Sequence, residues 1–181
     1  MTLFFVSLSI GIIVCLFLIW CINTYNTYQY LIIRINEAEA TIDSTLRKRF
    51  DLLNKSIGII KANSDIEEDI LEIVVKLRSR KLSNFELDRQ LYEAINEFQN
   101  VQDKYEELKK CESLMKIQVS LNESETEIVA SRKYYNDIIT KYNELVKKFP
   151  TILIAKICKF KEKTYFDGKN MEDEIINDFK L

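Results

Sequence analysis

Histidine is absent from the 181 residues of the chain, and glycine and proline are scarce, with three and one copies. The absence of histidine removes the commonest general base and the commonest ligand of transition metals. It also excludes a catalytic triad of the Ser-His-Asp kind. Because glycine and proline supply tight turns and interrupt helices, their scarcity leaves little material for hairpins. The sequence therefore predicts an all-α protein built from long helices.

Charged residues are plentiful but balanced, with 26 basic and 28 acidic side chains and a net charge of -2. The two signs are interspersed, whereas a nucleic-acid-binding protein normally carries a basic face, so no nucleic-acid partner is expected. None of the four cysteines belongs to a C-x-x-C pair. Two of them lie in an apolar segment, and we expect the other two, Cys111 and Cys158, to be buried, reduced thiols.

No recognisable catalytic constellation occurs in the sequence. A Gly-rich phosphate loop is missing, and a two-metal site in a helical bundle would require Glu-x-x-His pairs. The acidic cluster from Glu67 to Glu72 fits the favourable interaction of carboxylates with a helix N-terminus. We therefore expect no enzymatic activity, no metal and no cofactor.

An uncharged, apolar run extends from Leu3 to Ile22. Roughly 20 helical residues span the ~30 Å hydrocarbon core of a bilayer, and Trp20 and Tyr25 mark its end with side chains that favour the headgroup level. A cleaved signal peptide would need a basic N-terminal region and a small-residue cleavage site, and neither is present. Residues 1–23 are thus predicted to be a single-pass anchor in the cell membrane. Basic residues follow the run from Arg34 onward and none precedes it, which favours a cytoplasmic location for the rest of the chain.

Residues 24–166 show helical periodicity and are predicted to form a four-helix-type, antiparallel bundle of long helices. The first helix is expected to continue directly from the anchor. Capping-box pairs, Ser64 with Glu67 and Ser83 with Glu86, predict the starts of the second and third helices. The first apolar stripe consists of Tyr28, Ile32, Ile35, Ile42, Leu46, Leu53, Ile57 and Ile60, interrupted by Glu39 and Arg49. The third stripe consists of Leu87, Leu91, Ala94, Phe98, Val101, Tyr105 and Leu108.

A fourth helix is predicted from a seven-residue repeat that is typical of a bundle seam. Pro150 should end it, because proline cannot donate to the helical ladder and disfavours helical geometry at the preceding residue. Serines at seam positions indicate either close helix approach or a locally hydrated layer. The acidic segment 167–181 is expected to be a C-terminal tail. The repeat consists of Leu114, Leu121, Ile128, Tyr135, Tyr142 and Phe149, with Ile117, Ser124, Ser131, Ile138 and Leu145 three positions after each of the first five.

Two polar segments could form an interaction face. The first places Arg47 and Asp51 four residues apart, which predicts an ion pair within the first helix. The second mixes bases, tyrosines and amides along the fourth helix; as an alternative to partner recognition, the hydroxyls of Tyr135 and Tyr142 could bind Asn or Asp side chains within the core. The candidate face comprises Arg47, Arg49, Asp51, Arg132, Lys133, Tyr134, Asn136, Asp137 and Asn143.

The same segments carry a resemblance to a known family. Leu46 to Leu53 resembles the "RR-x-DLI" stretch of the bacterial LemA family, and residues 127–166 follow its "IA-x-AR-x-x-YND…YN…FP…IA…F-x-K…YF" pattern in order and spacing. The resemblance implies an N-terminal anchor followed by an antiparallel helical bundle, with no established enzymatic activity. Where the family usually has Pro-Asn-Leu-Val, this chain has Asn54-Lys55-Ser56-Ile57, so the first helix should be straighter. The usual "GYA-x-HE" is also replaced, by residues 62–67.

Two functions fit these features. The first is a membrane-tethered interaction or scaffold protein, whose unknown protein partner could also be a second copy of the chain. The alternative is a membrane-organising protein in which segment 151–163, apolar on one face and rich in lysine, binds the lipid interface. The same segment could instead pack against the end of the bundle.

Overall fold

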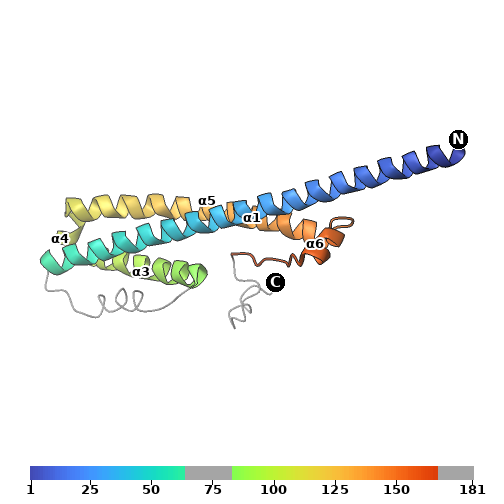
Figure 1. Cartoon of the computed structure of the whole chain (residues 1–181). Coiled ribbons are helices and arrows are strands. Elements are labelled where there is room, and N and C mark those ends of the chain that lie inside the picture. Colours follow the sequence, from blue (N-terminus) through green and yellow to red (C-terminus); the bar gives the residue numbers. More distant parts are fainter. Residues whose placement is uncertain (64–82, 167–181) are drawn as a thin grey trace, which may run out of the picture. The chain divides into compact units, whose positions relative to one another are not determined.

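The computed structural model describes residues 1–63 and 83–166, and every regular element in these two ranges is an α-helix. The helices are α1 (Thr2–Asn63), α3 (Asn84–Lys104), α4 (Glu106–Lys109), α5 (Glu112–Lys147) and α6 (Ile152–Cys158) (Figure 1). The predicted all-α class is confirmed. The second predicted helix, beginning near Ser64, and the acidic tail 167–181 lie outside the described residues.

These helices contribute to two compact units, and both α1 and α5 take part in each of them. Unit 1 comprises Met1–Glu37 and Tyr135–Tyr165. Unit 2 comprises the described residues of Ala38–Tyr134 together with Phe166. Within unit 2, α5 runs antiparallel to α1 and to α3 (Figure 1). Each unit therefore has its own core, built on a different stretch of the two long helices.

Helix α1 is continuous from the apolar run into the bundle residues, as the sequence predicts. Its 62 residues correspond to about 93 Å at 1.5 Å per residue. Its most apolar stretch is not buried within the protein. By length and composition, this helix can cross a membrane. It also passes through Asn54 without a break, at the place where the family usually has proline.

The predicted apolar stripe of α1 is buried from Tyr28 to Ile60, with Ile32 only partly covered. The two charged interruptions behave differently from each other. Glu39 is exposed, and the small side chain of Ala38 takes the buried position beside it. Arg49 is instead a member of the core, with 1% of its surface exposed. A charge within a stripe was therefore a poor indicator of where that side chain lies.

The predicted ion pair between Arg47 and Asp51 is wrong. Arg47 Nε lies 2.9 Å from a carboxylate oxygen of Asp43, one turn earlier on the helix. An acidic residue four positions before a basic one is the better helical arrangement, because it also suits the helix dipole. Both side chains are exposed, so the pair contributes only tenths of a kcal/mol.

Helix α3 begins at the predicted capping box. The Ser83 hydroxyl accepts a hydrogen bond from the Glu86 amide at 3.3 Å, and the Ser83 amide donates to the Glu86 carboxylate at 3.0 Å. The helix ends at Lys104, earlier than its apolar stripe suggested. Tyr105 has extended backbone angles and is 45% exposed, so it is not part of the stripe. Leu108 is buried, but from α4, which resumes the same spacing after the break.

The seven-residue repeat of α5 is buried at Leu114, Leu121, Ile128, Tyr135 and Tyr142. Phe149 departs from it and is 81% exposed, because the helix ends at Lys147, ahead of Pro150.

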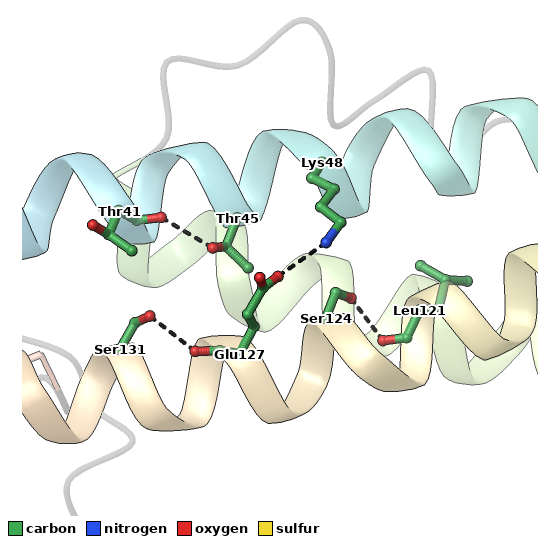
Figure 2. A network of polar contacts seen from close by, with 7 residues as sticks. All are labelled: Thr41, Thr45, Lys48, Leu121, Ser124, Glu127 and Ser131. Carbon is green, nitrogen blue, oxygen red and sulfur yellow. Dashed lines mark hydrogen bonds and ion pairs between the residues drawn. The ribbon is translucent and has the colours of Figure 1, made fainter.

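The serines of the seam bond to their own helix. Ser124, fully buried, donates to the Leu121 carbonyl at 2.6 Å, and Ser131 donates to the Glu127 carbonyl at 2.9 Å (Figure 2). These hydroxyls need no water layer to satisfy them.

After Pro150 the chain forms α6, which buries Ile154 and Ala155. One face of segment 151–163 therefore packs within unit 1, which agrees with the expectation that this segment packs against the rest of the protein. Cys158 at its end is exposed and Cys111 is partly exposed, and both are free thiols. The expected burial of Cys158 was wrong, because Cys158 lies at the end of a short helix that buries only its first turn.

Candidate functional site

Four charged side chains from three helices meet in unit 2, and we call them the charged cluster. Arg49 comes from α1, Asp88 from α3, and Glu125 and Arg132 from α5. Arg49 Nη1 lies 2.5 Å from Glu125 Oε2. Arg132 reaches Asp88 Oδ2 at 3.1 Å through Nη1 and Glu125 Oε1 at 3.7 Å through Nη2. Glu125 is thus shared between two guanidinium groups.

The charged cluster is neutral as a whole, and half of it is desolvated. The side chains of Arg49 and Asp88 are 2% and 9% exposed, against 38% for Glu125 and 32% for Arg132. Burial raises the pKa of the Asp88 carboxyl, although the Arg132 and Arg49 guanidinium groups oppose that shift. Desolvation can exceed the Coulombic gain of such pairs, so the cluster adds little net stability, while removal of one partner is costly.

Several polar atoms around the cluster lack an aligned hydrogen-bond partner among the described residues. They include Nε and Nη1 of Arg49 and Nε of Arg132. Arg49 Nη1 is close to Glu125 without the orientation of a hydrogen bond, so the attraction there is mainly between charges. A shift of α1 or α3 along α5 would leave a buried charge unpaired, which costs several kcal/mol. The chemistry of the cluster is therefore suited to fixing the register of α1, α3 and α5.

A second layer of contacts covers Arg132. Its guanidinium carbon lies 6.0 Å from the ring centre of Phe166, within the range of a cation–π interaction. Phe166 in turn meets the edge of Phe85, with ring centres 6.0 Å apart. At the surface of the same unit, Lys48 and Glu127 form an exposed ion pair of 3.0 Å between α1 and α5 (Figure 2). Such a pair contributes at most about 1 kcal/mol.

The residues of the predicted interaction face do not share one environment. Arg49 and Asn143 are buried, so neither side chain is available to a partner in this structure. Arg132 and Asn136 are partly covered. The members up to Tyr134 belong to unit 2 and the remaining three to unit 1. The exposed members are Arg47, Asp51, Lys133, Tyr134 and Asp137.

Asn143 holds the chain after α6 in place within unit 1. Its amide nitrogen donates to the Lys163 carbonyl at 2.8 Å, and its amide oxygen accepts from the Lys163 amide at 2.9 Å. The Tyr135 hydroxyl donates to the Thr164 carbonyl at 3.4 Å nearby. A backbone carbonyl is therefore among the partners of the Tyr135 hydroxyl. We call the two hydrogen bonds between Asn143 and the Lys163 backbone the Asn143 clamp.

An exposed row of uncharged side chains runs along α5 in unit 2, and we call it the uncharged stripe. Its members are spaced alternately by four and three residues, so they share one side of the helix. Met115, Val119 and Val129 are 51%, 58% and 53% exposed. Lys133, from the predicted interaction face, continues the spacing. The uncharged stripe consists of Met115, Val119, Asn122, Thr126 and Val129.

Sequence reasoning missed Asp88 and Glu125 as partners of Arg49 and Arg132. Arg49 is distant in sequence from Glu125, and Asp88 is distant from Arg132, so no local spacing relates these pairs. Glu125 and Arg132 lie seven residues apart on α5. One signal was present. Asp88 lies between Leu87 and Leu91 of one apolar stripe, and Arg49 lies between Leu46 and Leu53 of another. Opposite charges placed within stripes of two helices can indicate a buried pair.

Comparison with known proteins identifies a family. The model of one family, described as the LemA family, matches residues 38–177. That range covers more than half of the 181 residues and contains all four members of the charged cluster and the Asn143 clamp. A comparison with curated proteins gives no match. The chain belongs to the LemA family.

Proposed function

We propose that the chain is a single-pass membrane protein whose bundle is a non-catalytic module for binding another protein. The apolar run of α1 supports the membrane anchor. The rest of the protein does not cover its side chains. Exposure to water is unfavourable for them, because each exposed CH₂ costs about 0.8 kcal/mol in water relative to an apolar phase. Basic residues after the run favour a bundle on the cytoplasmic side.

A binding role, rather than catalysis, fits the groups that are available. The sequence has no histidine. Within residues 1–63 and 83–166, no group of three or more His, Cys, Asp or Glu side chains could hold a metal ion. Burial raises the pKa of the Asp88 carboxyl, but this group is engaged by Arg132 and has little solvent access.

The uncharged stripe is the observation that carries the proposal. Neighbouring exposed positions of α5 bear charges, such as Lys116, Glu123 and Glu127, whereas the stripe bears none over four turns. Its alternating spacing is that of a seam into which a second helix packs. We therefore propose that the partner presents an amphipathic helix with apolar residues at the same spacing. A second copy of the chain is the special case in which that helix is another α5.

Photo-crosslinking in native membranes tests the proposal. A photoreactive residue at Val119 of the full-length chain should give one discrete adduct, and the same residue at Lys116 should not. Lys116 is an apt control, because it is exposed on the same helix about 60° around the axis. The adduct should disappear in Val129→Lys, and an adduct of twice the chain's mass would identify a second copy. Equal labelling from both positions, or none from Val119, would contradict the proposal.

A further inference from the structure

Helix α6 has one buried side and one unusually apolar exposed side. Ile154 and Ala155 pack inward, while Leu153 and Ile157 are 45% and 76% exposed. Lys156 and Ile157 follow Leu153 by three and four positions, so each of them is a neighbour of Leu153 on the exposed side of the helix. Phe149, just before the helix, is 81% exposed. We use the name α6 face for a set of exposed residues in α6 and directly beside it: Phe149, Leu153, Lys156, Ile157, Lys159 and Lys161.

The α6 face is attached to α1 immediately after the apolar run. The Phe160 ring stacks near Tyr28 and Tyr25, with ring centres 4.7 and 6.1 Å apart. The Phe160 amide donates to the Ala155 carbonyl at 2.9 Å, which ties that ring to α6. The Tyr28 hydroxyl lies 3.3 Å from the Thr151 carbonyl at the start of α6. The residues that flank α6 are therefore both joined to the same turn of α1, and α6 lies beside α1 in Figure 1.

These contacts set the depth of α6 relative to a bilayer that α1 spans. Tyr25 and Tyr28 follow Ile22 by three and six residues, which is about 4.5 and 9 Å along a helix. The headgroup layer on each side of the hydrocarbon core is about 5–7 Å thick. Burial of α1 begins at Thr24, which is 7% exposed, so the packed part of unit 1 starts at this level. Tyr25 therefore lies within the headgroup layer and Tyr28 just beyond it, which places the α6 face at the outer part of the lipid headgroups.

The charges of the α6 face suit an anionic surface. Lys156, Lys159 and Lys161 are exposed and form no ion pair within the described part of the chain. Lys147 and Lys148 nearby are already paired, with Glu162 and Glu144. Basic side chains close to an anionic membrane surface are attracted to it. Exposed apolar side chains among lysines are the pattern of an interfacial helix.

We propose that the α6 face lies in the headgroup layer of the bilayer that α1 crosses, with its apolar side chains inserted and its lysines on anionic lipids. The inference rests on the anchor of the proposed function, but not on partner binding. A seven-residue helix would bind a membrane weakly by itself. Because α1 already holds it at the surface, its contact is intramolecular and a weak patch suffices. The second contact fixes the tilt and rotation of unit 1 on the membrane.

Two fluorophores in the full-length chain test this inference in vesicles of phosphatidylcholine with or without phosphatidylglycerol. The single tryptophan, Trp20, reports insertion of α1. An environment-sensitive dye on Cys158, which is exposed at the end of α6, reports the α6 face. A control dye at Asn36→Cys, an exposed position of unit 1 about 21 Å beyond Ile22 along α1, reports a site outside the bilayer. The other cysteines are replaced by Cys15→Ser, Cys21→Ser and Cys111→Ser, and Cys158→Ser in the control.

Doxyl-labelled lipids should quench the dye at Cys158 several-fold more than the dye at position 36. Quenching of the dye at Cys158 should be lost in the double variant that carries Leu153→Glu and Ile157→Glu. The change Lys156→Glu with Lys161→Glu should remove its dependence on phosphatidylglycerol, while Lys141→Glu on exposed α5 should not. Equal quenching at Cys158 and position 36, with Trp20 quenched, would overturn this inference alone. An unquenched Trp20 would overturn the anchor and this inference together.

Discussion

Arg49 Nη1 and Glu125 Oε2 lie 2.5 Å apart although the Arg49 side chain is almost completely buried. Only two residues away, Arg47 is 75% exposed and pairs with Asp43 on its own helix. The same residue type, on the same helix, is thus used once as a solvated surface charge and once as a buried charge between helices. This contrast provides a matched pair of substitutions.

Replacing Arg49 by alanine should destabilise the protein by about 3–5 kcal/mol, because it leaves a gap in the core and removes one of two guanidinium groups from Glu125. Arg47→Ala should change stability by less than about 1 kcal/mol, since its pair is exposed. Urea unfolding of the full chain in detergent, followed by circular dichroism, measures both values. Similar, small effects of the two changes would show that the charged cluster does not hold unit 2 together.

The raised pKa of Asp88 predicts a dependence of stability on pH. Because the folded state binds the Asp88 proton more tightly than the unfolded state, this group favours folding at low pH. That contribution is lost as pH rises from the ordinary Asp pKa, about 3.9, through the raised value. The stability of the natural chain relative to Asp88→Asn should therefore fall across this acid range. Unfolding of both chains at a series of pH values measures the difference, and a rise with pH would contradict the assigned sign.

Removal of the Asn143 clamp should loosen the segment after α6. Asn143→Ala loses two hydrogen bonds to the backbone of Lys163 and leaves its amide and carbonyl without these partners, at a cost of about 1–3 kcal/mol. Hydrogen exchange with mass spectrometry should show faster exchange in the peptide around residues 160–165. Lys141→Ala, at an exposed position of the same helix, is the control and should leave that peptide unchanged.

The parts of the fold that follow from the sequence are those set by local spacing. The start of α3 follows from Ser83 and Glu86, because both partners of a capping box lie within one turn. The α5 seam follows from apolar residues at seven-residue intervals, and its end follows from Pro150. In each case the interacting groups are close in sequence, so the pattern contains the whole interaction.

The site depends on partners that are distant in sequence. From the sequence, Arg49 was interpreted as an interruption of its apolar stripe. Nothing near it in sequence indicates that Glu125 and Asp88 of other helices lie beside it. Asn143 binds the backbone of Lys163, and a backbone group leaves no signature in residue type. The family resemblance pointed to the Arg132 and Asn143 segments, but not to their roles. Those roles required the three-dimensional arrangement.

Tyr28 and Tyr30 provide a final test, of how α6 is attached. Tyr28 is buried, and its hydroxyl donates to the Leu145 carbonyl at 2.6 Å, with the Thr151 carbonyl also within reach. Tyr28→Phe keeps the ring against Phe160 and removes the donor, so it should cost about 0.5–1.5 kcal/mol and speed hydrogen exchange in α6. Tyr30 is 55% exposed and its hydroxyl accepts from Arg34, so Tyr30→Phe should leave α6 unchanged. Exchange in α6 that is equally fast in both variants, or unaltered in Tyr28→Phe, would show that ring packing alone holds α6 on α1.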